Sequence, residues 1–314
     1  MSQINVDIIA ANTASTVTIL GGIAQGSSTS TYPNSTAWGS LTVSSGVNSH
    51  SEGAGTTASG QGSHAEGLAT IASAYGSHAE GLSTIASGLK SHAEGDKTTA
   101  SGVGAHTEGS GTTANGQYSH AEGYDTQALG YYSHAEGDRT YAGGAGSHAE
   151  GQQTYALFAY SHAEGYQTTG EGEASHAEGY QTTASGSFTH SEGNSTIASG
   201  NYSHAEGNQT TASGTASHAG GQQTIASGDY SYVGGAGSAA SGTHSFVHSS
   251  NSTASGARSV VIGGQNITGS ADDTVYTPRL ETAMTGEGII MKSPDGTRYK
   301  VTVANGGTIS IVSA

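Results

Sequence analysis

Histidine and glutamate recur in this sequence in a pattern suited to hydrogen bonding, ion pairing or metal binding. The stretch Ser-His-Ala-Glu-Gly stands at 63–67 and returns every fourteen residues without insertion or deletion. Its His keeps this register in thirteen copies, and a Glu follows two residues later in twelve of them. An imidazole and a carboxylate on one face can share protons or ligate a first-row metal ion. The pairs are His50 and Glu52, His64 and Glu66, His78 and Glu80, His92 and Glu94, His106 and Glu108, His120 and Glu122, His134 and Glu136, His148 and Glu150, His162 and Glu164, His176 and Glu178, His190 and Glu192, and His204 and Glu206, followed by His218 with Gly220 in the Glu position.

The repetition itself argues against catalysis, because an enzyme needs one constellation rather than a row of identical pairs. The sequence has no nucleophile elbow, no His-Glu-x-x-His zinc motif and no phosphate loop, so we expect no enzymatic activity. We interpret the pairs as an interface ladder of hydrogen-bonded His and Glu, since buried polar groups are normally paired. In this interpretation the carboxylate raises the pKa of the neighbouring imidazole, so that a charged His neutralises each Glu.

A metal site is the alternative interpretation of the same pairs. Three chains that each contribute one imidazole and one carboxylate, such as His64 and Glu66, would supply six ligands, which suits octahedral first-row ions. Short motifs of this kind match by chance often, so we predict that the protein has no cofactor and keep the metal ion as the second possibility.

The repeat predicts the elements that position these pairs. A second motif, Thr-x-Ala-Ser-Gly, fills the other half of the period, as at 56–60 and 84–88. A fixed period of fourteen residues indicates a solenoid whose coils each hold two short strands and two turns. Because side chains alternate along a strand, Ser63, Ala65 and Gly67 should face the narrow lumen, while His64 and Glu66 share the opposite face. The Thr and Ala of the second motif should also point inward, which disfavours an ice-binding Thr ladder.

The composition limits what the chain can be. Fifty-one Gly, one Trp and a hydrophobic fraction of 33% cannot build a conventional globular core in 314 residues, yet a disordered linker would have no fixed period. A single thin coil buries too little apolar area to offset its ordering entropy, so we expect partner chains. The net charge of −16 disfavours nucleic acid and anionic membranes as partners. The absence of Cys excludes disulfides.

No stretch of the sequence predicts membrane insertion. None approaches the apolar length of a spanning helix, and residues 1–14 have neither a basic start nor an apolar run, so we expect folding in the cell that makes the chain.

The period divides the chain into three predicted domains. Residues 1–34 are interpreted as an N-terminal attachment segment and linker, and residues 35–268 as a shaft of about sixteen coils. Residues 269–314 are interpreted as a small antiparallel β domain, because 288–292, 297–303 and 308–312 alternate like strands around turn signals at 294–296 and 305–307.

Apolar residues take the His and Glu positions of the last coils. We predict that they form an apolar plug that locks a trimer after the polar shaft, made of Tyr232, Phe246, Val260 and Ile262.

Aromatic residues recur at the turns on either side of the main motif. After it stand Tyr124, Tyr166 and Tyr180, and before it Tyr118, Tyr132, Tyr160, Phe188, Tyr202 and Tyr230. Such rings either pack across chain boundaries or form an exposed ridge that stacks on sugars. The candidate glycan ridge consists of Tyr118, Tyr132, Tyr160, Tyr202 and Tyr230.

Residues 259–263, Ser-Val-Val-Ile-Gly, resemble the Ser-Val-Ala-Ile-Gly core of the head repeats of trimeric autotransporter adhesins, the YadA-like heads. The small residues Ala254, Ser255 and Gly256 are spaced similarly, and the likeness covers 35–268. The resemblance implies a left-handed parallel β-roll of three identical chains around a common axis. The chain departs from the family by placing His and Glu where the family has Val and Ile, and it shows neither the signal peptide nor the C-terminal membrane anchor of an autotransporter.

Related rolls occur in bacteriophage fibres, and residues 293–299 look like the ends of some phage virion and tail proteins. We therefore predict an all-β, homotrimeric structural fibre of a bacteriophage virion, a tail or head fibre that mediates host-surface attachment. Its partners would be two identical chains, other virion proteins and a host cell-surface glycan or protein. The alternative is an adhesin head on a bacterial cell surface, and the third hypothesis is an ice-binding or other repeat-surface protein.

Overall fold

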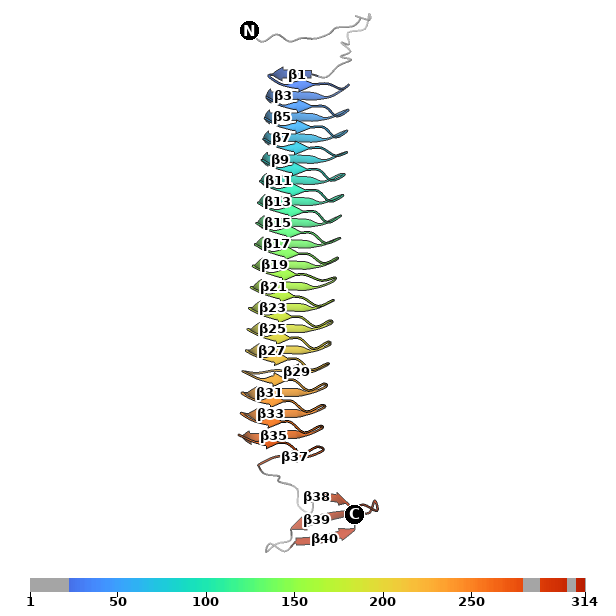
Figure 1. Cartoon of the computed structure of the whole chain (residues 1–314), viewed down its shortest axis with the longest axis vertical. Helices are drawn as coiled ribbons and strands as arrows, with labels where there is room; N and C mark the ends of the chain where they lie inside the picture. The colour runs from blue at the N-terminus through green and yellow to red at the C-terminus, as the bar shows by residue number, and fades with distance from the viewer. Residues whose placement is uncertain (1–22, 279–288, 304–308, 314) are drawn as a thin grey trace, which may run out of the picture.

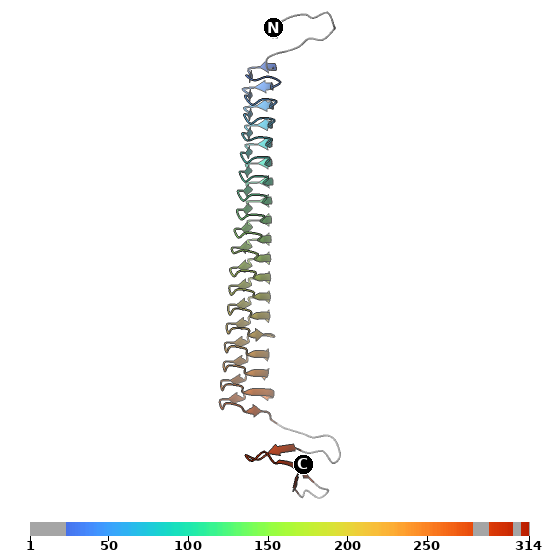
Figure 2. The ribbon, with the colours of Figure 1, turned by 90° about the vertical axis from the view of Figure 1, so that its right-hand side faces the viewer.

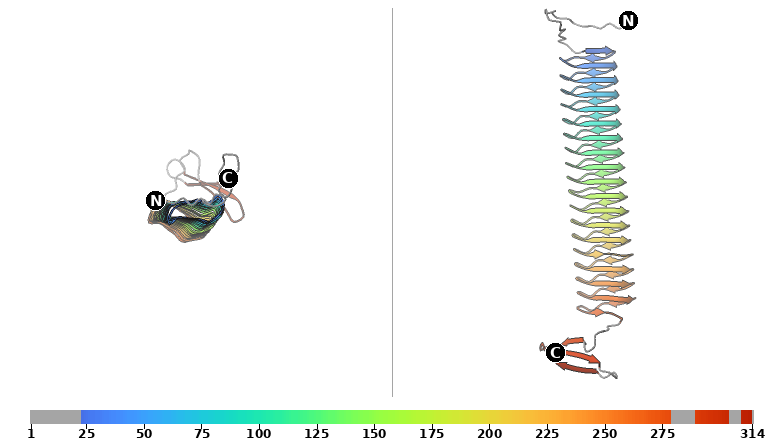
Figure 3. Two further views of the ribbon diagram at one scale, coloured as in Figure 1. Left: turned by 90° about the horizontal axis from the view of Figure 1, so that it is seen from above. Right: turned by 180° about the vertical axis from the view of Figure 1, so that it is seen from behind.

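The chain forms a long, narrow solenoid of stacked coils followed by a small sheet (Figure 1). The structure is a computed structural model, and it describes residues 23–278, 289–303 and 309–313. A typical fourteen-residue coil contains a five-residue strand, a turn, a two-residue strand and a second turn, as in β7 (His64–Leu68) and β8 (Ile71–Ala72). The coils follow one another along a nearly straight axis, and their cross-section is a flattened oval (Figures 2 and 3). The predicted all-β parallel solenoid is confirmed.

Two parallel sheets run the length of the solenoid. The longer strands are β1 (Ile23–Gly26), β3 (Thr36–Ser40), β5 (His50–Ala54), β7, β9 (His78–Leu82), β11 (His92–Asp96), β13 (His106–Ser110), β15 (His120–Tyr124), β17 (His134–Asp138), β19 (His148–Gln152), β21 (His162–Tyr166), β23 (His176–Tyr180), β25 (His190–Asn194), β27 (His204–Asn208), β29 (His218–Ala219), β31 (Tyr232–Ala236), β33 (Phe246–Ser250), β35 (Val260–Gln265) and β37 (Val275–Tyr276). The shorter strands are β2 (Thr29–Ser30), β4 (Val43–Ser44), β6 (Thr57–Ala58), β8, β10 (Ile85–Ala86), β12 (Thr99–Ala100), β14 (Thr113–Ala114), β16 (Gln127–Ala128), β18 (Tyr141–Ala142), β20 (Tyr155–Ala156), β22 (Thr169–Gly170), β24 (Thr183–Ala184), β26 (Ile197–Ala198), β28 (Thr211–Ala212), β30 (Ile225–Ala226), β32 (Ala239–Ala240), β34 (Thr253–Ala254) and β36 (Thr268–Gly269).

The sheets are in register, so each repeat position forms a column. His64 pairs with His78, and Glu66 with Glu80, in parallel strands offset by fourteen residues. The sheet of longer strands has nineteen members, which at about 4.8 Å per layer gives a solenoid about 85 Å long. Like side chains therefore stack on like side chains along one straight face.

The lumen is filled by small side chains, as the alternation predicted. Ala58, Ala65 and Thr56 are fully buried, and so are their equivalents along the solenoid. The Ser63 hydroxyl donates to the Gly60 carbonyl oxygen at 2.7 Å and closes the second turn. Because the Thr column is lumenal, it forms no surface ladder of the kind an ice-binding protein presents.

The alternation fails at the glycine that ends the main motif. Gly67 is exposed rather than lumenal, and its φ of +105° turns the strand outward. A Cβ atom there would lie 2.2 Å from the Gly81 carbonyl oxygen, so only Gly fits at this layer spacing. The expectation that Gly67 faces inward was wrong, because it assumed a straight strand.

The solenoid extends one coil beyond each predicted boundary of the shaft. At its start, β1 pairs with β3 after a thirteen-residue step from Ile23 to Thr36. At its end, β36 and β37 add a coil after a register shift between His248 and Ser250 that lengthens the step to fifteen residues. Neither end keeps the exact fourteen-residue period. The predicted number of about sixteen coils, which counted only coils of that period, was therefore too low. The division into three functional domains stays a prediction.

The small C-terminal antiparallel sheet is also confirmed. It consists of β38 (Ile289–Lys292), β39 (Arg298–Val303) and β40 (Ile309–Ser313). Its first turn is closed by Asp295, whose carboxylate accepts a hydrogen bond from the Thr297 amide at 2.9 Å. The second predicted turn, at 305–307, lies outside the described residues. Within the described ranges, no helix is long and apolar enough to cross a membrane.

Candidate functional site: the histidine–glutamate face

The regular fourteen-residue spacing of His places thirteen imidazoles in one column on the outer face of the longer strands. Each ring is about one-third exposed, and successive rings from His64 to His204 stack with centroids 4.6–4.9 Å apart and planes within 13° of parallel. The column ends with tilted rings, because His50 lies at 76° to His64 and His218 at 65° to His204. The structure thus brings all the predicted pairs together on a single face.

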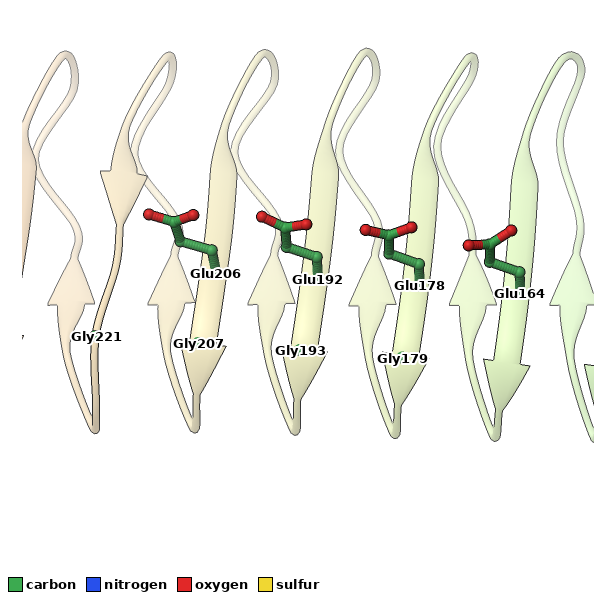
Figure 4. Close-up of a pocket in the computed structure, with 8 residues that line it drawn as sticks. All are labelled: Glu164, Glu178, Gly179, Glu192, Gly193, Glu206, Gly207 and Gly221. Atoms are coloured by element: carbon green, nitrogen blue, oxygen red, sulfur yellow. The ribbon is translucent and has the colours of Figure 1, made fainter.

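The Glu carboxylates form a second column beside the imidazoles, next to a groove. Figure 4 shows Glu164, Glu178, Glu192 and Glu206 projecting side by side from successive strands. Next to them runs the column of motif-ending glycines, which have no side chain to fill the space. One stretch of this groove, lined by these carboxylates and by Gly179, Gly193, Gly207 and Gly221, has a volume of about 470 Å³. A second stretch of about 310 Å³ lies beside Glu94, Glu108 and Glu122. We name this feature the Glu–Gly groove.

Most imidazoles in the column lack a hydrogen-bond partner among the residues that the structure describes. Only the terminal pairs are hydrogen-bonded, His50 to Glu52 and His218 to Glu206, each at 3.2 Å between Nε2 and the carboxylate. Between them the closest Nε2–carboxylate distances are 3.4–3.8 Å. From His64 to His204 each Nε2 atom is buried and unpartnered. The single chain therefore leaves this row of polar atoms unsatisfied, at a free-energy cost.

The pairing of His with Glu changes its direction along the column. Up to His176 the imidazoles that contact a carboxylate, which do not include His106, lie nearest the Glu of their own coil, whereas His190 lies 3.7 Å from Glu178 of the preceding coil. His204 and His218 follow the second pattern, with Glu192 and Glu206. Glu178 is thus the carboxylate that faces an imidazole from each side.

The expected rise in His pKa was wrong. Burial lowers the pKa of His134 below its usual 6.5, the positive charge of His148 lowers it further, and Glu136 and Glu150 only partly oppose this. The same direction, with burial as the largest cause, holds for His78, His106, His120, His148, His162, His176 and His204. In these eight imidazoles burial and the like charge of stacked neighbours together outweigh the attraction of the adjacent carboxylates, so the pKa shift favours the neutral ring.

The pKa values of two neighbouring carboxylates in the middle of the Glu column, Glu108 and Glu122, shift in opposite directions. A hydrogen bond to Glu108 raises the pKa of Glu122 to about 7, and burial and the charges of Glu108 and Glu136 act in the same direction. The pKa of Glu108 is correspondingly lowered by its hydrogen bond to Glu122. The like charges of the column are therefore relieved in part by protonation of a carboxylate rather than of the imidazoles.

The predicted plug residues occupy the same columns as the His and Glu. His218 pairs with Tyr232, Tyr232 with Phe246 and Phe246 with Val260 in the parallel ladder. The rings of Tyr232 and Phe246 stack at 5.0 Å, and Ile262 is 49% exposed. At the other end Trp38 stands in the Glu column and is 46% exposed. Sequence reasoning missed Trp38, although its place two residues after Thr36 in the repeat register was the available signal.

Four segments of the chain, 79–105, 93–119, 177–203 and 205–231, match the YadA head domain repeat. The matched segments lie among the coils that bear His and Glu on their outer face. Together they cover less than half of the chain. No curated protein matches it.

The coils present several groups of side chains that could hold a metal ion, and one such group consists of His78, Glu80 and His92. Their ligand atoms lie within 4.8 Å of one another. The two rings, however, are 4.7 Å apart in planes only 2° from parallel, and metal–nitrogen bonds of about 2.0–2.1 Å require lone pairs that converge. One chain therefore offers an ion one imidazole and one carboxylate per coil, and the metal site stays a prediction that depends on other chains.

The tyrosines of the candidate glycan ridge stand at one edge of the solenoid. Tyr118, Tyr132, Tyr160, Tyr202 and Tyr230 are each more than half exposed. Tyr118 stacks on Tyr132 at 5.3 Å, and Tyr202 on Phe188 at the same distance. At the opposite edge Tyr166 stacks on Tyr180 at 5.2 Å. Some of the ridge rings thus stack on an aromatic ring one coil away, and all five remain more than half exposed.

Proposed function

We propose that this chain is the shaft of a homotrimeric attachment fibre and has no enzymatic role. The observation that carries the proposal is the unpartnered face, in which half-buried imidazoles without hydrogen bonds continue into the exposed side chains of Tyr232 and Ile262 and the half-buried ring of Phe246. A lumen of Ala, Ser and Thr offers little apolar burial, so association along this face supplies what the single coil lacks. The match to YadA head repeats supports the number three, because YadA-like heads are homotrimeric.

The fibre belongs on an outer surface, either of a virion or of a bacterial cell. The match to head repeats supports a bacterial adhesin head. The small antiparallel sheet, with its resemblance to the ends of phage virion and tail proteins at 293–299, supports a tail or head fibre. In the virion case residues 1–34 attach the shaft to other virion proteins, and residues 269–314 contact the host.

The aromatic ridge is the part of this fibre that we propose contacts a host glycan. Its rings are exposed, flat and amphipathic, which suits stacking on sugar faces. Replacing Tyr118 and Tyr132 by Ala should abolish binding on a glycan array, while replacing Tyr166 and Tyr180 on the opposite edge should not. Equal loss from both double variants would indicate a structural role instead.

Sedimentation of the full chain tests the assembly. A trimer has three times the chain mass of 31.0 kDa, and we expect no folded monomer. Antibodies against the shaft, observed by electron microscopy on phage lysates and on bacterial cells, assign the carrier. A stable folded monomer would contradict the proposal, and a trimer that labels neither surface would contradict the attachment role.

A further inference from the structure

We propose that the aromatic ridge binds one neutral pyranose at Gly146, where the sugar lies between the rings of Tyr132 and Tyr160. This inference rests on the proposed glycan contact of the ridge and adds where the sugar sits and which class of sugar fits.

The ridge tyrosines belong to one column, made of the residue directly before each copy of the main motif. Its side chains stack from coil to coil, as Tyr118 does on Tyr132 at 5.3 Å. The member between Tyr132 and Tyr160 is Gly146. These two tyrosines are therefore two layers apart, about 9.6 Å, with no side chain of the column between them. We name this position the Gly146 gap.

The two rings beside the gap have open faces. Tyr160 is the most exposed tyrosine of the ridge, at 68%, and within the described residues no aromatic ring stacks on either of its faces. Tyr132 is 65% exposed and stacks on Tyr118, one coil back, so its other face is directed toward the gap. Both walls are thus accessible to a ligand from solvent.

The coil that carries the gap supplies a floor of small residues. Its turn is Gly-Gly-Ala-Gly at 143–146, whereas the flanking turns, Leu-Gly-Tyr-Tyr at 129–132 and Leu-Phe-Ala-Tyr at 157–160, carry large apolar side chains. The ring of Tyr141 covers one end of the floor, because a Cβ at Gly143 would lie 2.4 Å from its Cε1 atom.

The rings lean toward the coil before them, which keeps the gap one ring wide. A Cβ at Gly146 would lie 3.1 Å from Cδ1 of Tyr160, and one at Gly104 would lie 2.8 Å from Cδ1 of Tyr118. Tyr160 and Tyr118 thus rest on the preceding glycine in the same way. Because Tyr118 still lies one stacking distance from Tyr132, the same lean at Tyr160 leaves room for one ring above Tyr132.

The width of the gap favours a pyranose over a planar ring. A planar ring in contact with both walls needs them about 7–8 Å apart, twice the best separation between carbon atoms. A pyranose chair is puckered and carries hydrogens on both faces, so it is thicker and meets both walls across two layers. Its apolar C–H faces contact the rings while its hydroxyl groups stay in solvent.

The charges near the gap disfavour anionic sugars. The three turns that form it contain no charged residue, and the next turn carries Glu171 and Glu173, both exposed, in a chain of net charge −16. Carboxylated and sulfated sugars are repelled there, whereas a neutral hexose or N-acetylhexosamine is not. The column has two other single gaps, but Ala174 and Ala216 keep a methyl group, and Ala174 directly follows Glu173.

Filling the gap tests the inference. The substitution Gly146→Tyr completes the column, and the backbone accepts it because Tyr132 and Tyr160 have φ values of 54° and 58° where Gly146 has 63°.

The matched control is Gly104→Tyr. Gly104 also has a φ of 63° and also lies one coil before a tyrosine, but the residue on its other side is Lys90 rather than a ring. The control therefore adds an exposed ring to the column without closing the Gly146 gap.

An array of glycans that end in glucose, galactose, mannose, N-acetylglucosamine or sialic acid gives the readout for the full chain. We expect the wild type to bind members with a neutral terminal pyranose, Gly146→Tyr to bind them at least about tenfold more weakly, and Gly104→Tyr to bind as the wild type does. The direction is decisive, because a sugar lying along the outer edge of the ridge would gain from an added ring.

The other outcomes are distinct. Equal or tighter binding by Gly146→Tyr, or binding of sialylated members alone, would overturn the inference and leave the glycan contact of the ridge standing. No binding by the wild type would overturn both. A trimer that dissociates in Gly146→Tyr but not in Gly104→Tyr would show that a neighbouring chain fills the gap, which also overturns the inference.

A second pair of variants measures the wall without filling the gap. Tyr160→Leu removes one aromatic wall, and Tyr180→Leu removes a ring of similar exposure on the opposite edge. We expect binding to weaken about tenfold in the first variant only. Equal binding by the two variants would overturn the inference.

Discussion

The buried threonines of the lumen offer the sharpest test of how this solenoid is stabilised. Thr70 is fully buried, and its hydroxyl has no hydrogen-bond partner, because the residue opposite it across the lumen is Ala65. In one coil the chain supplies a partner, where the hydroxyl groups of Ser191 and Thr196 lie 2.8 Å apart. Two coils with the same backbone thus differ in a single hydrogen bond.

Replacing Thr70 by Val should therefore stabilise its coil, while Thr196→Val should destabilise its own. A buried hydroxyl without a partner costs about 1–3 kcal/mol, which Thr70→Val removes and which Thr196→Val imposes on Ser191. The double variant Ser191→Ala with Thr196→Val removes both hydroxyls and should recover most of the loss. The two single variants are predicted to change the free energy of unfolding in opposite directions. A change in packing alone, from replacing a hydroxyl by a methyl group, would act in the same direction at both sites.

Hydrogen exchange is the suitable assay, because each coil of a solenoid contacts only its neighbours and a local change reads out locally. The Thr57 amide bonds the Thr70 carbonyl oxygen at 2.8 Å, and the Ile71 amide bonds that of Thr84 at 2.9 Å. Exchange at these amides should slow about tenfold for each 1.4 kcal/mol gained. Faster exchange in Thr70→Val, matching Thr196→Val in its coil, would refute the reasoning and show that the Thr70 hydroxyl is already satisfied.

Three further predictions concern the groove floor, the imidazoles and the plug. Gly193→Ala should lower the free energy of unfolding by more than about 3 kcal/mol, since strain at positive φ adds to a backbone clash. Gly62→Ala, with open space around its Cβ, should lower it by about 1 kcal/mol, and thermal unfolding measures both. The melting temperature should fall as pH drops through 6.5, because eight His side chains have a lowered pKa in the folded chain and bind fewer protons there than in the unfolded chain. Their effect outweighs that of Glu122, whose raised pKa stabilises the fold in acid. A melting temperature that rises in mild acid would contradict this. Phe246→Ser with Val260→Ser should loosen the trimer at this end first, at about 2–5 kcal/mol for each large apolar side chain, and unchanged protease resistance around 243–263 would count against the plug.

The period of the sequence determined most of the fold. A step of fourteen residues in a parallel solenoid leaves no choice of register. The pairing of His64 with His78 and of Glu66 with Glu80 could therefore be predicted directly. The lumenal Ala and Thr columns followed from alternation. The thirteen-residue step at Ile23 and the fifteen-residue step after His248 were not predicted, because a rule of exact fourteen-residue repetition cannot identify coils of another length.

The chemistry of the face was less accessible than its geometry. Spacing showed that His134 and Glu136 are neighbours, but the sign of the His pKa shift depends on burial and on the like charge of His148, which lies fourteen residues away. The Glu–Gly groove was not predicted either. It requires Gly137 to turn outward, and the conformation of one glycine cannot be obtained from side-chain alternation alone.

In the proposed homotrimer, the uniform ladder affects how the copies align along the axis. If one chain slides past another by one coil, about 4.8 Å, every His and Glu meets an equivalent partner again and only the last layer loses its contact. The polar face thus resists separation while leaving axial slippage nearly free. Alignment must come from the coils that break the pattern, Trp38 at one end and Tyr232, Phe246 and Val260 at the other. The number of coils between these ends can therefore change by whole repeats without altering the cross-section, and shaft length is free to vary while the ends keep the chains flush.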